Sequence, residues 1–203
     1  MQDWQKISLL DHESLICIED SQSVVLDVDL KKIRKYKNIE SKFVEFKSIA
    51  HEKKLNVSLW ITNPKSIEDL TTFLTRNPVF ELADVKFFIL SLQSLDIQLN
   101  KDTAKKTFLD FSNISPKDYE KQFNTAAKLH YRGIILDAQI FKRSHIVLAH
   151  KFNLDFAISG IMYERHLQAA NASETDLKIF GEIFEKSKKV FFAVSLFNWM
   201  SRL

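Results

Sequence analysis

Two stretches of the sequence share a pattern that decides the fold: AHEKKLNVSLWIT at residues 50–62 and AHKFNLDFAISGI at residues 149–161. In each, Ala-His is followed at the same offset by Leu, and a mostly apolar segment comes next. We interpret both as the end of a helix, a short turn and a buried strand. Histidine is favoured in a last helical turn because the free carbonyls there make that end negative. His51 and His150 are therefore predicted to mark helix ends rather than to carry chemistry.

Other apolar runs extend this pattern along the chain. Near-continuous apolar runs of this length are typical of strands buried on both faces, as in parallel sheets. Helical patterns lie between most of the runs, so that each unit takes roughly 25–30 residues, the size of a strand–helix repeat. We predict strands at residues 15–20, 23–29, 56–62, 85–92, 106–111, 133–138 and 155–160.

The predicted helices are supported by residues that favour helix starts. Ser66, Ser115 and Ser144 each precede a helical pattern, and Pro116 suits a first helical turn. A further helix is expected over residues 39–54, where phenylalanines recur at helical spacing. Ser173 and Thr175 are candidate caps for a long helix that runs towards the C-terminus.

Alternating strands and helices favour a parallel α/β fold with right-handed crossovers. We predict one domain over residues 1–203, a parallel (β/α) barrel of the TIM-like or PHP-like kind with a C-terminal helical segment. A barrel is preferred over an open doubly wound sheet because the strands are evenly spaced and no glycine-rich switch-point loop occurs.

Composition excludes several classes of function. Three glycines cannot build a Walker loop or a GxGxxG turn, and no GxSxG motif is present. The single cysteine, Cys17, permits no internal disulfide and no multi-cysteine metal site. We find no signal-peptide pattern and no apolar run of the ~20 residues that span a bilayer. We therefore expect a soluble cytoplasmic protein, or a nuclear one in a eukaryote, that has no membrane partner.

Histidines and carboxylates are the candidates for catalysis. The six histidines form neither HxH nor HExxH, so a histidine-rich metal centre is not favoured. Carboxylates stand at the ends of predicted strands, where barrel enzymes place catalytic groups. They would bind Mg²⁺ or transfer protons, or else cap the turns that follow, as aspartate often does. These residues are Asp27, Asp29, Asp110 and Asp137.

Basic residues cluster in short runs that also hold aromatic rings or histidine. Cations next to flat rings are what a phosphate backbone with exposed bases requires. The net charge of +3 and the pI of about 8.8 are compatible with a nucleic-acid partner but do not require one. The runs cover residues 31–37, 128–133, 141–145 and 163–166.

The order of motifs over residues 45–190 resembles the archaeal and eukaryotic ribonuclease P protein component 3, the thirty-kilodalton subunit family. NTAAKLHYRGIILDAQIF (124–141) is similar to the family's helix with an alanine pair and a basic-glycine step into a strand. VLAHKFNLDFAISGIMYERHL (147–167) is similar to its late helix and a strand that ends in Ile-Ser. The first 40 residues do not match, and ANASETDL (170–177) lacks the basic residue that the family carries before its terminal helix.

The resemblance implies a barrel related to metal-dependent phosphoesterases that has lost their metal ligands. It also implies a non-catalytic subunit that binds ribonuclease P RNA and protein component 2, and precursor tRNA indirectly. The RNA would then remove the 5′ leader of precursor tRNA and would hold Mg²⁺, with no cofactor, metal or catalytic residue on the protein. The expected RNA contacts are Lys142, Arg143, Arg165 and His166, followed by Lys31, Lys32, Arg34 and Lys35.

Two other readings stay open. One is a metal-dependent phosphodiesterase barrel of the glycerophosphodiester or cyclic-dinucleotide type, which would use Asp27, Asp110 and Asp137 with a divalent metal. The other is a degenerate barrel that serves only as a protein-binding scaffold.

Overall fold

The computed structural model describes residues 2–8, 18–33, 35–36, 38–63, 72, 85–91, 99–162, 164–173 and 175–180. Its centre is a closed barrel of eight strands that follow one another in chain order. Every neighbouring pair is parallel, and β8 closes the barrel against β1. The strands are β1 (Gln2–Ser8), β2 (Ser23–Asp29), β3 (Asn56–Thr62), β4 (Phe88–Ser91), β5 (Thr107–Asp110), β6 (Gly133–Asp137), β7 (Asp155–Ile161) and β8 (Leu177–Phe180).

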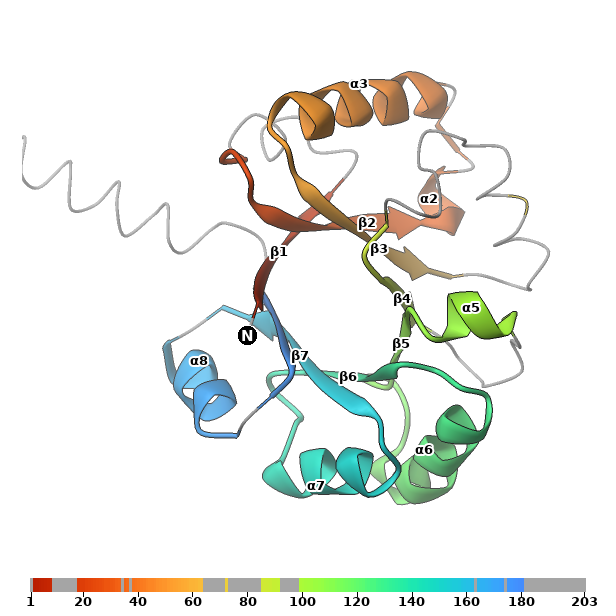
Figure 1. Cartoon of the computed structure of the whole chain (residues 1–203), viewed down its shortest axis with the longest axis vertical. Helices are drawn as coiled ribbons and strands as arrows, with labels where there is room; N and C mark the ends of the chain where they lie inside the picture. Colours follow the sequence, from red (N-terminus) through yellow and green to blue (C-terminus); the bar gives the residue numbers. More distant parts are fainter. Residues whose placement is uncertain are drawn as a thin grey trace, which may run out of the picture.

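Helices surround the strands, as Figure 1 shows in a view along the barrel. This arrangement is the (β/α)₈ architecture of TIM barrels, so the predicted α/β barrel is confirmed. No helix in the described part of the chain is long and apolar enough to cross a membrane. The helices are α2 (Leu30–Ile33), α3 (Ile39–Glu52), α5 (Lys101–Ala104), the 3₁₀ turn η1 (Pro116–Asp118), α6 (Tyr119–Lys128), α7 (Arg143–Lys151) and α8 (Glu164–Asn171).

Two apolar layers hold the barrel together. Side chains that point outward from the strands pack against the helices, where Phe43 and Phe46 of α3 and Phe123 of α6 are fully buried. Side chains that point inward fill the barrel itself, and this inner cluster includes Trp4, Trp60 and Phe108. Because successive strand residues alternate between the two sides, both layers draw on the same strands.

The pattern shared by residues 50–62 and 149–161 is a helix end with a defined geometry. Lys54 and Asn153, at equal offsets in the two copies, have positive φ angles of 52° and 56°. The next residue, Leu55 or Leu154, donates its backbone N–H to the carbonyl of Ala50 or Ala149 at 2.9 and 3.1 Å. A left-handed residue followed by this bond defines the Schellman end of a helix. The predicted position of His51 and His150 in the last turns of α3 and α7 is thus confirmed.

Three expectations about individual elements were wrong. Residues 18–20 of the expected strand 15–20 are not in a strand, and residues 15–17 lie outside the described residues. Strand β1 was not predicted at all, because its polar residues interrupt the apolar pattern. Strand β8 was expected to be the start of a C-terminal helix, whose remaining part, residues 181–203, lies outside the described residues. Of the helix predicted after Ser66, only residue 72 is described, and it is helical.

Candidate functional site

The predicted RNA-binding residues follow the C-terminal ends of strands. Lys31 and Lys32 belong to α2, which begins directly after β2, and Lys35 follows that helix. Lys142 and Arg143 stand where α7 begins after β6. The side chains of all five are exposed. We call them the C-terminal rim cations, because the C-terminal ends of all strands meet at this mouth of the barrel.

The rim cations form two groups: Lys31, Lys32 and Lys35 after β2, and Lys142 and Arg143 after β6. Asp29, the last residue of β2, fixes the backbone of the first group. Its Oδ1 accepts the backbone N–H groups of Lys31 and Lys32 at 2.9 and 3.2 Å, and the side-chain amide of Asn63 at 3.1 Å. Burial raises the pKa of Asp29, but the hydrogen bonds and the nearby Lys32 charge together lower it below its usual value. Asp29 therefore acts as a helix cap. Tyr36, whose side chain is 54% exposed, adds a flat ring beside Lys35.

His145 fixes the second group of rim cations. Its Nδ1 accepts the backbone N–H of Lys142 at 3.1 Å, and its own backbone N–H donates to the carbonyl of Lys142 at 2.9 Å. Burial and the charge of Lys142 lower the pKa of His145, so the ring is neutral at pH 7. The neighbouring connection after β5 adds the exposed Lys117, which the sequence reading did not select.

The structure does not show the other predicted RNA contacts, His166, Arg165 and Arg34, as exposed cations. His166 is only 8% exposed, because it and Ala170, one helical turn later, form the inward face of α8. Its ring is thus not on the surface where a contact with RNA was expected. Arg165 lies in α8, but its side chain lies outside what the structure describes, and Arg34 is outside the described residues.

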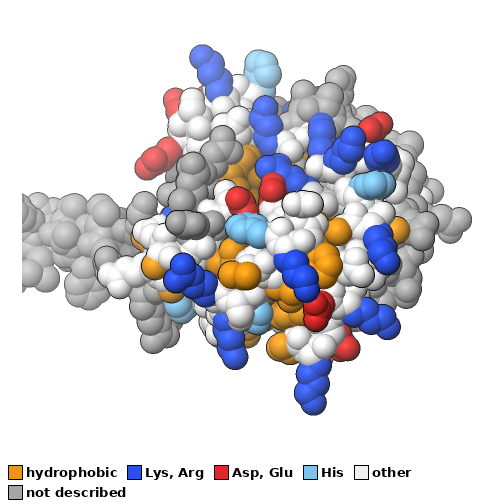
Figure 2. All heavy atoms as spheres, turned by 60° about the horizontal axis from the view of Figure 1, so that its bottom comes forward, with side chains coloured by type: hydrophobic (Ala, Val, Ile, Leu, Met, Phe, Trp, Pro, Cys, Tyr) orange, Lys and Arg blue, Asp and Glu red, His pale blue; other side chains and the backbone are white. Residues whose placement is uncertain are grey.

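The two groups of rim cations lie on opposite sides of the mouth. Strands β2 and β6 are four steps apart in either direction around the closed barrel. Figure 2 turns the side with α6 and α7 forward and shows Lys and Arg side chains spread over it, with acidic side chains among them. The exposed cations of η1, α6 and α7 are Lys117, Lys121, Lys128, Lys142, Arg143 and Lys151.

The strand-end carboxylates lie between these groups and take part in a polar layer across the mouth. Asp27 Oδ2 contacts Lys6 Nζ at 3.2 Å, and this ammonium group lies 4.1 Å from the centre of the Trp60 ring. Asp27 Oδ1 is buried and has no hydrogen-bond partner among the described residues. Both side chains are about one-third exposed, at 28% for Lys6 and 31% for Asp27. Asp27 is thus a strand-end carboxylate with a buried, unused oxygen.

The rest of the polar layer is a chain of hydrogen bonds. Trp60 Nε1 donates to Ser91 Oγ at 2.8 Å, and Ser91 Oγ donates to Asp110 Oδ2 at 2.6 Å. The other oxygen of Asp110 accepts the backbone N–H of Ser112 at 2.9 Å, and Ser112 Oγ accepts the backbone N–H of Asp137 at 3.0 Å. These two aspartates thus hold the loops that follow β5 and β6.

A metal site was the alternative use of Asp27, Asp110 and Asp137. Within the described ranges, no three His, Cys, Asp or Glu side chains gather as metal ligands would. Asp137 Oδ1 accepts the backbone N–H of Gln139 at 2.8 Å, which is the turn-capping role that aspartate often takes. Lys6, Trp60, Ser91 and Ser112 were missed by the sequence reading. The isolated lysine and serines carry no motif, and only the pairing of strands brings them together.

Comparisons with known proteins show the fold. No protein-family model and no curated protein sequence matches the chain. Among solved structures, phosphoribosyl anthranilate isomerase from Thermus thermophilus is 9% identical, with a TM-score of 0.54 over 89% of this chain and 87% of its own. Orotidine 5′-monophosphate decarboxylase from Metallosphaera sedula is 11% identical, with a TM-score of 0.56 over 89% and 88%. A 3-hexulose-6-phosphate synthase is 10% identical, with a TM-score of 0.53 over 89% and 90%.

A further similar structure, described as a glycerophosphoryl diester phosphodiesterase from Agrobacterium tumefaciens, is 11% identical. The alignment covers 67% of this chain and 57% of that one, with a TM-score of 0.45. At this TM-score the likeness supports no conclusion. Together with the closed eight-stranded barrel, the other three structures show that the chain has a TIM-barrel fold.

Proposed function

We propose that this protein is a non-catalytic RNA-binding subunit of ribonuclease P, which supports removal of the 5′ leader from precursor tRNA. The observation that carries the proposal is the exposure of Lys142 and Arg143 at the start of α7, with the exposed Lys117 in the connection after the neighbouring strand β5. Cations in this position attract phosphates, and the positive end of the helix macrodipole favours the same charge. The resemblance in motif order supplies the identity of the RNA and of the expected protein partner, component 2.

The second group of rim cations supports the same proposal. Lys31, Lys32 and Lys35 provide positive charge, and Tyr36 provides an exposed ring on which a base can stack. Because the two groups face each other across the mouth, a folded RNA that covers the mouth would contact both. Catalysis would belong to the RNA and its Mg²⁺.

Salt dependence of binding tests the role of the rim. Replacing Lys142→Gln together with Arg143→Gln should weaken binding to ribonuclease P RNA by about tenfold at moderate salt. It should also reduce the slope of log affinity against log salt concentration, since fewer counterions are released. The control is Lys42→Gln with Lys47→Gln in α3, which removes the same charge elsewhere; Lys47 is exposed, and Lys42 is half-buried and paired with Glu45. Equal slopes in the two double variants would contradict the proposal.

Two activity measurements test the identity of the enzyme. Adding the protein to ribonuclease P RNA with component 2 should increase cleavage of precursor tRNA at its 5′ leader. The protein alone, with Mg²⁺ or Mn²⁺, should not hydrolyse a generic phosphodiester such as bis(p-nitrophenyl) phosphate. Hydrolysis that is lost in Asp27→Asn would instead favour the phosphodiesterase reading.

A further inference from the structure

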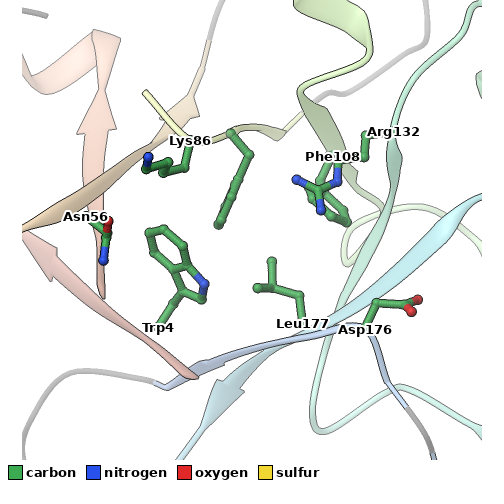
Figure 3. Close-up of a pocket in the computed structure, with 8 residues that line it drawn as sticks. Trp4, Asn56, Lys86, Phe108, Arg132, Asp176 and Leu177 are labelled. Carbon is green, nitrogen blue, oxygen red and sulfur yellow. The ribbon is translucent and has the colours of Figure 1, made fainter. Parts of the chain in front are cut away.

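The N-terminal mouth of the barrel, opposite the rim cations, contains a cavity of about 400 Å³. Residues of the cavity lie at or just before the starts of strands, since Asn56 begins β3 and Leu177 begins β8. It is therefore separate from the polar layer of Lys6, Asp27 and Ser91 at the other end. The cavity is lined by Trp4, Asn56, Lys86, Phe87, Phe108, Arg132, Asp176 and Leu177 (Figure 3).

Aromatic rings form the apolar wall of this cavity. Phe87 contacts Trp4 and Phe108 edge to face, with ring centres 4.7 and 5.6 Å apart. The indole N–H of Trp4 is buried and has no hydrogen-bond acceptor within the described residues. A buried donor without an acceptor is unfavourable, so a ligand oxygen or nitrogen placed there would be held by it. In Figure 3 the nitrogen side of the Trp4 ring faces Leu177 across the cavity.

Two cations stand on opposite sides of the same cavity (Figure 3). Lys86 precedes β4, its side chain is exposed, and it forms no ion pair with any carboxylate that the structure describes. Arg132 precedes β6, and its Nε donates to Asp155 Oδ2 at 3.0 Å while the guanidinium group lies 5.0 Å from the centre of the Phe108 ring. A guanidinium group carries five N–H donors, so the Nη atoms have donors beyond this bond. Lys86 and Arg132 thus suit an oxyanion.

One carboxylate also lines the cavity, but it is already engaged. Asp176 Oδ2 accepts the backbone N–H of Phe156 at 2.7 Å and lies 3.2 Å from Nε2 of His150. Figure 3 shows the carboxylate of Asp176 directed away from Trp4 and Leu177. Its bond to the backbone of Phe156 in β7 fixes the connection into β8. Asp176 therefore does not neutralise the charge of Lys86, which can still attract an anion.

More lysines surround the mouth. Each of the strands from β3 to β7 is preceded within five residues by lysine or arginine. The acids close to them in sequence include Glu52, Asp102 and Asp84, of which Asp84 lies outside the described residues. Asp155 is paired with Arg132, and Glu120 with Lys151. Several cations close together raise the local concentration of phosphate-bearing ligands. The lysines that do not line the cavity are Lys53, Lys54, Lys105, Lys106, Lys128 and Lys151.

We propose that the N-terminal mouth cavity binds a nucleoside phosphate. The phosphate would bind to Lys86, and the base would lie against the aromatic wall with an acceptor on Trp4 Nε1. The Nη groups of Arg132 would provide further donors on the opposite side of the cavity. A volume of about 400 Å³ is within the range of small-ligand sites, and the mixture of rings with a few polar groups is typical of them. A free nucleotide and an unpaired nucleotide of an RNA share this chemistry. The proposal does not depend on the role of the C-terminal rim.

Calorimetric titration of the full-length protein tests the proposal with adenosine 5′-monophosphate, adenosine, inorganic phosphate and a single-stranded oligoadenylate. We expect saturable binding of the nucleotide or the oligoadenylate, and weaker binding of adenosine and of phosphate. Saturation by the free nucleotide identifies a nucleotide site. Binding of the oligoadenylate alone identifies an RNA site in this cavity when Lys86→Gln weakens it and Lys142→Gln with Arg143→Gln does not. Absence of saturable binding by all four ligands, or phosphate that binds as tightly as the nucleotide, would overturn the proposal.

Variants connect this binding to the cavity. Lys86→Gln should weaken binding about tenfold, as expected for loss of one charge-assisted contact. Lys105→Gln removes the same charge from the same face without lining the cavity and should change affinity less than twofold. Equal effects of the two variants would refute the site. Lys142→Gln with Arg143→Gln should leave nucleotide binding unchanged, so this proposal and the proposed function can fail independently.

Discussion

The two tryptophans that point into the barrel, Trp60 and Trp4, show how its two mouths differ. At the C-terminal mouth, the indole N–H of Trp60 is bonded to Ser91, and through it to Asp110. At the N-terminal mouth, the indole N–H of Trp4 has no acceptor in the part of the chain that the structure describes. The C-terminal layer therefore uses most of its polar groups to hold loops, with Asp27 Oδ1 as an exception. The N-terminal layer leaves a donor for a ligand.

The two mouths thus differ from those of TIM-barrel enzymes in where loops are held and where a donor is left unused. TIM-barrel enzymes place their sites at the C-terminal mouth, and the N-terminal mouth contributes to stability. Here the carboxylates Asp110 and Asp137 at the C-terminal mouth cap loops, and the exposed cations stand outside them. The cavity with an unused donor lies at the other end. The fold alone thus does not say which mouth binds a ligand.

The largest expected effect compares a glycine at each mouth. A Cβ on Gly133, at the start of β6, would lie 2.3 Å from the carbonyl oxygen of Asp155 and 2.7 Å from Phe108 Cε1. Because a paired backbone cannot yield easily, Gly133→Ala should destabilise the protein by about 3 kcal/mol. Urea unfolding monitored by circular dichroism measures this change.

Gly160, near the end of β7, is the matched position at the C-terminal mouth. Its φ is +67°, and an added Cβ would lie 2.6 Å from Asp137 Oδ2. A side-chain carboxylate can rotate away, so Gly160→Ala should cost about 1–2 kcal/mol, largely from the left-handed backbone. A cost at Gly160 that equals or exceeds that at Gly133 would show that the C-terminal mouth is the more rigid one.

The next largest effect concerns Ser91, which joins Trp60 to Asp110. Ser91→Ala would remove two hydrogen bonds and leave a nearly buried carboxylate oxygen without its donor. We expect a loss of about 2 kcal/mol in the free energy of unfolding. Ser112→Ala is the control, because its Oγ accepts one bond, from the backbone N–H of Asp137. If both variants cost the same, the chain of hydrogen bonds adds nothing beyond its separate members.

Much of the fold was predictable because most strands are buried on both sides. The ranges 23–29 and 56–62 were predicted with the bounds that β2 and β3 have. The ends of α3 and α7 were also predictable, since Ala-His and a following turn mark them locally. The general alternation of strand and helix then determined the class of fold.

The two strands that close the barrel were not predictable by the same rule. In β1, Trp4 and Ile7 are buried, but Lys6 points into the polar mouth and breaks the apolar run. In β8, Lys178 is only 5% exposed and donates to the side chain of Asn171 in α8. A lysine at this position would be taken for a surface residue from the sequence alone, so it also interrupts the apolar pattern. Their pairing with each other depends on contacts across nearly the whole chain. The candidate cavity could not be predicted for the same reason, because Lys86, Arg132 and Trp4 line one cavity only when the barrel closes.

A smaller effect tests whether acids at the C-terminal mouth restrain its positive charge. Asp29→Asn keeps an oxygen for capping α2 but loses the charge-assisted part of its bonds, so we expect a loss of about 1 kcal/mol at neutral pH. Removing the negative charge beside Lys31 and Lys32 should also strengthen RNA binding about two- to threefold. Binding that stays unchanged would show that these lysines are not in the RNA interface.

The acid limb of the stability curve provides a second measurement on Asp29. Its pKa in the folded protein is below the ordinary value of 3.8, so its contribution is present above pH 3.8 and is lost as the pH falls through the folded pKa. Wild-type protein should therefore lose more stability than Asp29→Asn when the pH is lowered from 5 towards 2. Parallel acid limbs in the two proteins would contradict the assignment of the cap.

The smallest effect is expected at the two tryptophans themselves, and it is the most direct test of the difference between the mouths. Trp60→Phe removes a donor that is bonded to Ser91, so it should cost about 1 kcal/mol beyond the change in packing, as for loss of a typical hydrogen bond. Trp4→Phe removes a donor without an acceptor, so it should cost less than Trp60→Phe by about that amount. The order should reverse for ligands: Trp4→Phe should weaken nucleotide binding and Trp60→Phe should not. Both variants shorten an inward-facing indole to a phenyl ring, but Trp60 also lies under the Lys6 ammonium and Trp4 packs on Phe87. The opposite effects on ligand binding are therefore the sharper part of the contrast between the two N–H groups.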